Sequence, residues 1–219
     1  MLLKHTPKND NHFLIYKQSL YLLQIFWLNN IMIKLFFIKI LTILIIIIFP
    51  FVSFAFNESH LEKLKSLNEC SQCDLDSAVL SKESLKNAIL NNVNFKGANL
   101  TDTKLHRANL KDANLSKADL SRANLTNANL KEANLTNAKL RSAQLYNANL
   151  SKANLTNADL SGAKLVSANL IGASLVNTNF KNVNLTDADL TNAEMKDANI
   201  DNAILCRTKM PWGYENGGC

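Results

Sequence analysis

The sequence predicts an all-β fold, a solenoid in which the chain turns a corner once every five residues. Two observations lead to this prediction. Every residue whose number is divisible by five is apolar from Leu75 to Leu205, which makes 27 units with Leu in 23 of them. The residue two before each of these is Ala in 21 of the 27 units. A repeat this regular determines the architecture before local propensities are considered.

A period of five excludes both regular secondary structures. In an α-helix a Leu at every fifth position sweeps around the axis, and in a flat strand successive Leu side chains alternate between faces. A chain with one corner per unit keeps every Leu and Ala inside. The position two after each Leu holds Asn in ten units and Gly in three, at Gly97, Gly162 and Gly172. These residues tolerate left-handed backbone, so this position is predicted to be the corner.

Units such as Ser116-Lys117-Ala118-Asp119-Leu120, repeated in tandem, resemble the pentapeptide-repeat family, and the resemblance covers residues 71–205. It implies a right-handed, four-sided parallel β-helix with four units per coil. With coils stacked about 4.8 Å apart, as strands are in a sheet, the rod is about 32 Å long. The small Ala is then required, because Leu from four sides fills the remaining interior.

The chain divides into four segments at the edges of this repeat. A repeat-free segment precedes the solenoid, and a short tail follows it. The expected boundaries are an export segment at 1–55, an N-terminal cap at 56–70, the β-helix at 71–205 and a C-terminal cap or tail at 206–219.

Residues 32–55 have the pattern of a secretory signal peptide. A lysine-containing start precedes an apolar run from Ile40 to Val52, and small residues, Ser53 and Ala55, stand at −3 and −1 of a cleavage site after Ala55. This pattern predicts a bacterial protein that is periplasmic or secreted.

The alternative is an uncleaved segment that anchors the protein to the membrane. A further apolar run around residues 21–28 favours this alternative. Residues 1–31 resemble no domain, which suggests that translation starts at Met32 and not at Met1. Contact with a membrane is expected only through an uncleaved export segment.

The segment that follows is predicted to form a short helix over the first coil. Ser59 and Glu62 match a capping box, and Leu61, Leu64 and Leu67 share one helical face. Such a helix would cover strand edges that otherwise invite aggregation. The alternative is a disordered linker left after processing.

The repeat is irregular near its ends. Glu83 occupies an inward position, where an unpaired carboxylate is costly, so it either binds a ligand or, as we favour, points outward from a distorted coil. In the tail, Met210, Trp212 and Tyr214 are candidates to close the last coil.

Four cysteines lie at the two boundaries of the repeat and are expected to form disulfides in an exported chain. Only Cys70 and Cys73 have Cys-x-x-Cys spacing, so a zinc site lacks its second pair. Of the three connectivities, Cys70–Cys73 with Cys206–Cys219 is favoured. The rod separates the two pairs, and a disulfide needs Cα atoms within about 7 Å.

Charge and composition exclude several classes of function. The 24 basic and 18 acidic residues give a net charge of +6, but residues 1–55 carry +4 of it, so residues 56–219 are nearly neutral at +2. This balance gives little support for a nucleic-acid partner. The histidines, His5, His12, His60 and His106, form no catalytic register, and no glycine-rich phosphate loop is present. No enzyme activity, cofactor or metal is expected.

The remaining candidate is a surface. Residues twenty apart should stack in columns along the rod, and Tyr146, Val166, Ile171 and Val176 give a modest apolar zone on the later coils. Scattered exposed apolar side chains are also ordinary, so this zone is weak evidence for a partner.

The expected function is a non-enzymatic, exported scaffold whose sides bind a protein that the sequence does not identify. The sequence does not indicate an oligomeric state. One alternative is a DNA mimic that protects a topoisomerase, as some members of the resembled family do, but near-neutral charge and export argue against it. The other is a membrane-anchored repeat protein.

Overall fold

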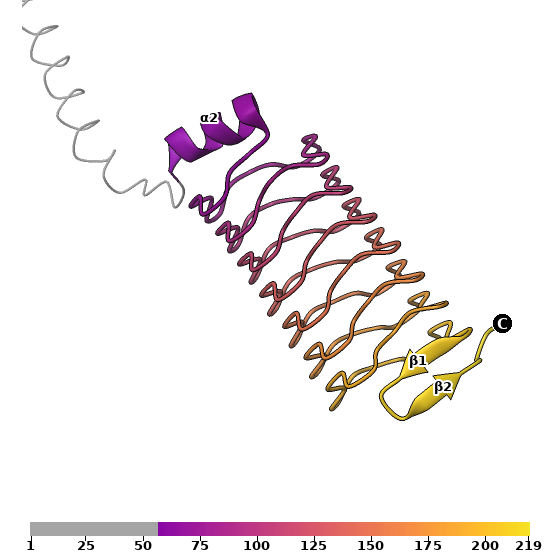
Figure 1. The fold of residues 1–219 in the computed structure, drawn as a ribbon. Helices are drawn as coiled ribbons and strands as arrows, with labels where there is room; N and C mark the ends of the chain where they lie inside the picture. The colour runs from indigo at the N-terminus through magenta and orange to yellow at the C-terminus, as the bar shows by residue number, and fades with distance from the viewer. Residues whose placement is uncertain (1–56) are drawn as a thin grey trace, which may run out of the picture. The chain divides into compact units, whose positions relative to one another are not determined.

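The computed structural model describes residues 57–219, which form a helix, a long solenoid and a C-terminal hairpin (Figure 1). Helix α2 spans Glu58–Leu67, and strands β1, Thr208–Met210, and β2, Gly213–Glu215, pair antiparallel after the last coil. The predicted segments 1–31 and 32–55 lie outside the described residues.

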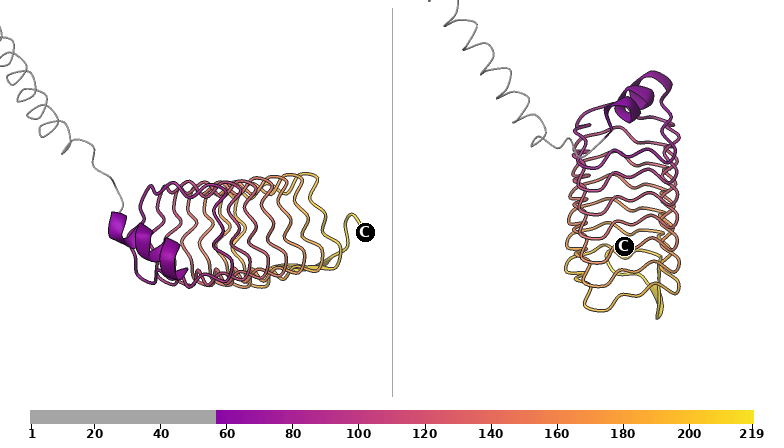
Figure 2. Two further views of the ribbon diagram at one scale, coloured as in Figure 1. Left: turned by 90° about the horizontal axis from the view of Figure 1, so that it is seen from above. Right: turned by 90° about the vertical axis from the view of Figure 1, so that its left-hand side faces the viewer.

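The coils of the solenoid stack one upon another (Figure 2), and each has the four sides that the family resemblance implies. Parallel bridges join residues twenty apart, from Glu69 with Ile89 to Asp189 with Lys209. Successive bridges fall five residues apart, so four units complete one coil. Each bridge uses two backbone hydrogen bonds, as where Leu90 N donates to Asn109 O at 2.8 Å and Asn109 N donates to Ala88 O at 2.9 Å.

The predicted corner position has left-handed backbone in every unit. The φ angle is 57° at Asn127, 64° at Gly97 and 61° at Lys117. Left-handed backbone is unfavourable for a residue such as lysine, so the ladder bonds on both sides of the corner must offset that cost.

The interior is filled by the Leu and Ala of each unit. Leu at the fifth position is at most 4% exposed from Leu75 through Leu190, and the Ala side chains are equally buried. Two threonines replace Ala inside the coil and satisfy their hydroxyls. Thr103 Oγ1 donates to Leu80 O at 2.9 Å, and Thr178 Oγ1 donates to Leu155 O at 2.8 Å.

The ladder extends beyond the predicted 71–205 boundaries at both ends. Cys70, fully buried, and Met210, 3% exposed, stand in the Leu position, and Thr208 is buried in the Ala position. Residues 206–210 therefore form one more unit, which the sequence pattern does not reveal because Thr and Met replace Ala and Leu. The expectation that Trp212 and Tyr214 close the last coil is wrong, because these side chains are 59% and 69% exposed.

Helix α2 packs against the first coil, with two differences from the sequence pattern. The residue that caps its N-terminus is Asn57, whose Oδ1 accepts from Ser59 N at 3.1 Å, so the predicted Ser59–Glu62 capping box is not the cap used. Leu64 is buried in the core and Leu61 packs beside it, but Leu67 is 64% exposed.

Glu83 is exposed, in agreement with the outward orientation favoured from the sequence. It lines a recess together with Leu64 and Lys65 of α2. Its carboxylate therefore carries no burial penalty.

Candidate functional site

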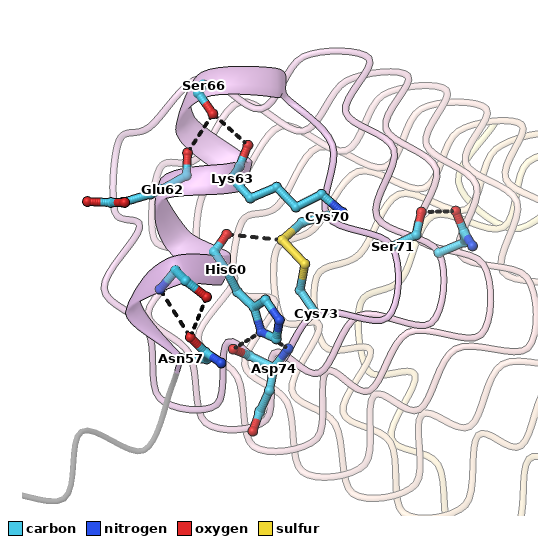
Figure 3. The surroundings of a disulfide bond; sticks show 11 residues. Asn57, His60, Glu62, Lys63, Ser66, Cys70, Ser71, Cys73 and Asp74 are labelled. Carbon is cyan, nitrogen blue, oxygen red and sulfur yellow. Dashed lines mark hydrogen bonds between the residues drawn. A yellow bond between two sulfur atoms is a disulfide. The ribbon is translucent and has the colours of Figure 1, made fainter.

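The first disulfide lies where α2 meets the first coil (Figure 3). Cys70 and Cys73 are bonded at an S–S distance of 2.05 Å, and both are buried. The carbonyl oxygen of His60 lies 3.1 Å from Cys70 Sγ. A disulfide sulfur has no proton to donate, so this is a packing contact and not a hydrogen bond.

His60 also closes one strand edge of the first coil. The backbone N–H of Asp74 lies 3.0 Å from His60 Nδ1 and donates to it (Figure 3). Asn57 N donates to Asp74 O at 3.2 Å on the same edge. The helix is thus joined to the ladder by polar contacts as well as by Leu64.

The second disulfide fastens the tail. Cys206 and Cys219 have Cα atoms 4.8 Å apart, and Gly217 O of the loop that they close accepts from Leu205 N of the last coil at 2.7 Å. The structure therefore pairs the four cysteines in the connectivity that the sequence favours.

Several ion pairs on the rod join residues that stack twenty positions apart. Arg122 Nε and Nη2 donate to the two carboxylate oxygens of Asp102, both at 2.8 Å, and Arg207 binds Asp187 in the same way at 2.6 Å. The hydrogen bonds from the arginines lower the pKa of Asp102 and of Asp187.

Asparagine side chains form ladders along two sides of the coil. Asn94 donates to Asp74 at 2.7 Å and Asn114 donates to Asn94 at 3.0 Å, while Asn129 donates to Asn109 at 3.1 Å on the adjacent side. The asparagines of these sides thus present ordered, neutral amides.

The predicted apolar zone is divided among three corners. Tyr146 and Val166 are twenty residues apart and stack in one column, both half-buried. Ile171, 39% exposed, and Val176 belong to the next two corners around the coil. The structure thus brings Tyr146 and Val166 together and separates the other two from them.

A basic recess lies in the same column, nearer to α2, at residues that form no recognisable motif in the sequence. The signal that could have found it is the absence of any acidic residue twenty positions from Arg107. The residues that line the recess are Lys86, His106, Arg107, Asn124, Thr126 and Asn127.

Within residues 57–219, no three His, Cys, Asp or Glu side chains gather as metal ligands would. No helix in that range has the length and apolar character needed to cross a membrane.

The model of one protein family matches the chain. The pentapeptide repeats family matches in eight copies over residues 69–107, 103–141, 143–182 and 168–210, which is more than half of the sequence. No curated protein matches significantly.

Three solved structures illustrate the similarity. The chain is 32% identical to HetL from Nostoc sp. strain PCC 7120, a protein involved in regulating heterocyst differentiation, covering 66% of this chain and 73% of HetL at a TM-score of 0.33. It is 36% identical to a pentapeptide repeat protein from the Arabidopsis thaliana thylakoid lumen, over 44% and 68% of the two chains at a TM-score of 0.43.

The third is QnrB1, a plasmid-mediated fluoroquinolone resistance protein, at 20% identity over 62% of this chain and 81% of QnrB1, with a TM-score of 0.37. The family match spans the whole ladder from Glu69 to Lys209. This chain therefore belongs to the pentapeptide repeat family, whose right-handed, four-sided β-helix is the fold described above.

Proposed function

We propose that this protein is an exported, non-enzymatic scaffold that binds a protein partner along the side of its solenoid. The observation that carries the proposal is the pair of disulfides, Cys70–Cys73 and Cys206–Cys219, at opposite ends of the ladder. Disulfides persist in oxidising compartments, and the signal-like pattern of residues 32–55 supplies a route to one.

We propose that α2 caps the first coil, since Leu64 closes the core there and His60 occupies a strand edge. Flat, rigid sides are the surfaces that solenoid proteins use for binding. The proposed contact is the corner column that holds Tyr146 and Val166, together with the sides that meet there.

A DNA-mimicking function is not favoured. Residues 56–219 carry 19 basic and 17 acidic residues. The arginine pairs further neutralise part of that acidic charge, as at Asp102. A mimic of a phosphate backbone requires a concentrated negative face.

Export is tested by cell fractionation and N-terminal sequencing of the natural protein. A cleaved N-terminus at Phe56 outside the cytoplasm is expected, and soluble cytoplasmic protein with an intact N-terminus would refute the proposal. An intact N-terminus in the membrane fraction would instead identify the anchored alternative.

Binding is tested by placing a photocrosslinking amino acid at position 146 and, as the matched control, at Thr156. These positions are half a coil apart, so they face opposite corners. In the native envelope, position 146 should give discrete crosslinked products and position 156 should not. Equal products at both positions, or none at either, would contradict a partner on this column.

A further inference from the structure

Arg107 differs from the other arginines of the chain. Arg122, Arg141 and Arg207 each pair with an aspartate of a neighbouring coil. Arg107 makes no ion pair with any residue between 57 and 219, and its stacked neighbours twenty residues away are Asn87 and Asn127. Its guanidinium is exposed, with donors that no carboxylate of the described chain accepts.

The protein itself shows what an arginine at this corner binds. Arg122 and Arg207 occupy the same position within their units as Arg107, and each presents Nε and Nη2 to both oxygens of one carboxylate. This fork geometry is the one in which arginine recognises carboxylates most strongly. An external carboxylate beside Arg107 would complete the same arrangement.

The surroundings of Arg107 favour an anion. Lys86 and His106 line the recess with it, and His106 Nδ1 is buried without a hydrogen-bond partner in the described part of the chain. A buried polar atom without a partner needs an explanation, and a polar ligand bound beside His106 would supply one. Of the nearby carboxylates, Asp102 is held by Arg122, and Glu83 lines the separate recess beneath α2.

The same column continues into the apolar pair. Lys86, His106, Thr126, Tyr146 and Val166 follow at intervals of twenty residues, one per coil. With coils about 4.8 Å apart, roughly 10–14 Å separates the basic recess from Tyr146 and Val166. An extended peptide rises about 3.3 Å per residue, so it crosses that distance in three or four residues.

We propose that this column binds an extended segment of a partner protein that carries a carboxylate and, three or four residues away, a bulky apolar side chain. The carboxylate pairs with Arg107 in the recess, and the apolar side chain packs on Tyr146 and Val166. This inference rests on the proposed scaffold function and specifies the chemistry of the segment that it recognises.

The test uses the purified full chain, labelled with ¹⁵N, and a blocked peptide with one Glu and one Leu three residues later in a Gly/Ser background. Amide shifts should concentrate at residues 106–107, 126–127, 146 and 166. A peptide with Gln in place of Glu should bind at least about fivefold more weakly. Binding should also weaken in 0.5 M salt, because exposed charges are screened.

The decisive variant is Asn87→Asp, which leaves Arg107 in place. Asn87 has a φ of 57°, close to the 59° of Asp102, so an aspartate there should capture Arg107 as Asp102 captures Arg122. Binding of the Glu peptide should fall at least about fivefold, as it should in Arg107→Gln. Arg122→Gln is the matched control, because it removes a paired arginine, and it should bind the peptide normally.

Each other outcome would overturn the inference. Unchanged affinity in Asn87→Asp and Arg107→Gln, or an equal loss in Arg122→Gln, would show that general positive charge and not this recess attracts the peptide. Displacement of the peptide by an equal concentration of inorganic phosphate would identify a site for small oxyanions. If crosslinking at position 146 succeeds while these variants bind normally, the scaffold proposal stands and only the recess is wrong.

Discussion

The two ends of the solenoid are closed by different means and to different degrees. At the N-terminal end α2 lies over the first coil, and Leu75, Leu80 and Leu85 there are at most 4% exposed. At the C-terminal end the tail follows the last coil (Figure 1), yet Met195 and Ile200 remain half-buried. The core is fully buried at the end where α2 lies and only partly buried at the end where the hairpin lies.

The two ends differ in how fully the core is buried, but both leave backbone N–H groups of the ladder without a partner among residues 57–219. In the first coil, the N–H groups of Val79 and Ser84 have no partner among residues 57–219, although the core beneath them is closed. In the last coil, the N–H groups of Met195 and Ile200 are likewise unpaired in that range. Covering the core and ending the ladder are therefore separate tasks, and both ends leave strand edges of the ladder open.

The largest expected effect distinguishes the two ends by their packing. Leu64→Ala removes a fully buried side chain from the closed end and should cost about 2–5 kcal/mol, whereas Leu205→Ala removes a half-buried one and should cost less than half as much. Leu67→Ala is the control, because Leu67 is 64% exposed in the same helix. Urea unfolding followed by circular dichroism measures all three. Equal losses at residues 64 and 205 would show that the two ends are equally closed.

The disulfides give a second, smaller difference. Cys206–Cys219 closes a loop with a sequence separation of 13, whereas Cys70–Cys73 closes one of 3. Loop-closure entropy then predicts losses of roughly 3 and roughly 2 kcal/mol for the two paired Cys→Ser variants. The C-terminal variant should also release the tail, seen as faster hydrogen exchange at Leu205 N, which donates to Gly217 O. Unchanged exchange at Leu205 would contradict a fastening role.

The smallest expected effect comes from the exposed ion pairs. The folded-state pKa values of Asp102 and Asp187 are lowered by their arginines, so the pairs stabilise the fold above the unfolded-state pKa. That stability is lost as the pH falls below about 4 and through the lowered folded-state pKa values. The double variant Asp102→Asn and Asp187→Asn should lose less thermal stability between pH 7 and pH 2.5 than the natural protein. An identical or steeper acid loss would show that the pairs contribute nothing, as some exposed pairs do.

The sequence predicts the coil well because one physical requirement recurs in every unit. Burying five-residue units around one axis requires an inward Leu, an inward Ala and a left-handed corner in each unit. Because every unit repeats this pattern, the prediction is supported many times over in one sequence. The ends could not be predicted as well, because Cys70, Thr208 and Met210 fill repeat positions with other residue types. These side chains are buried as Leu and Ala are, but because their residue types differ from those of the repeat, the five-residue period cannot be recognised there.

The candidate surfaces were the least predictable part. The period determines which residues share a column. It predicts that Tyr146 stacks on Val166, and it assigns Ile171 and Val176 to other corners, so the four residues do not form one apolar zone. The recess at Arg107 depends on which residues are missing from the adjacent coils. The lack of a carboxylate beside Arg107 becomes apparent only when the residues that stack on it, twenty positions away, have been identified.

The four-sided coil itself is tested most directly by comparing two deletions. Removing residues 116–135 deletes one whole coil and returns every remaining Leu to its inward position, at the cost of an exposed ion pair at Arg122. Removing Asn127 alone leaves a four-residue unit that cannot reach its corner, so Leu130 is forced out of the core. Thermal unfolding by circular dichroism should show a cooperative, slightly less stable fold for the twenty-residue deletion and a much larger loss for the single one. If the single deletion is tolerated as well as the twenty-residue deletion, the four-sided coil is wrong.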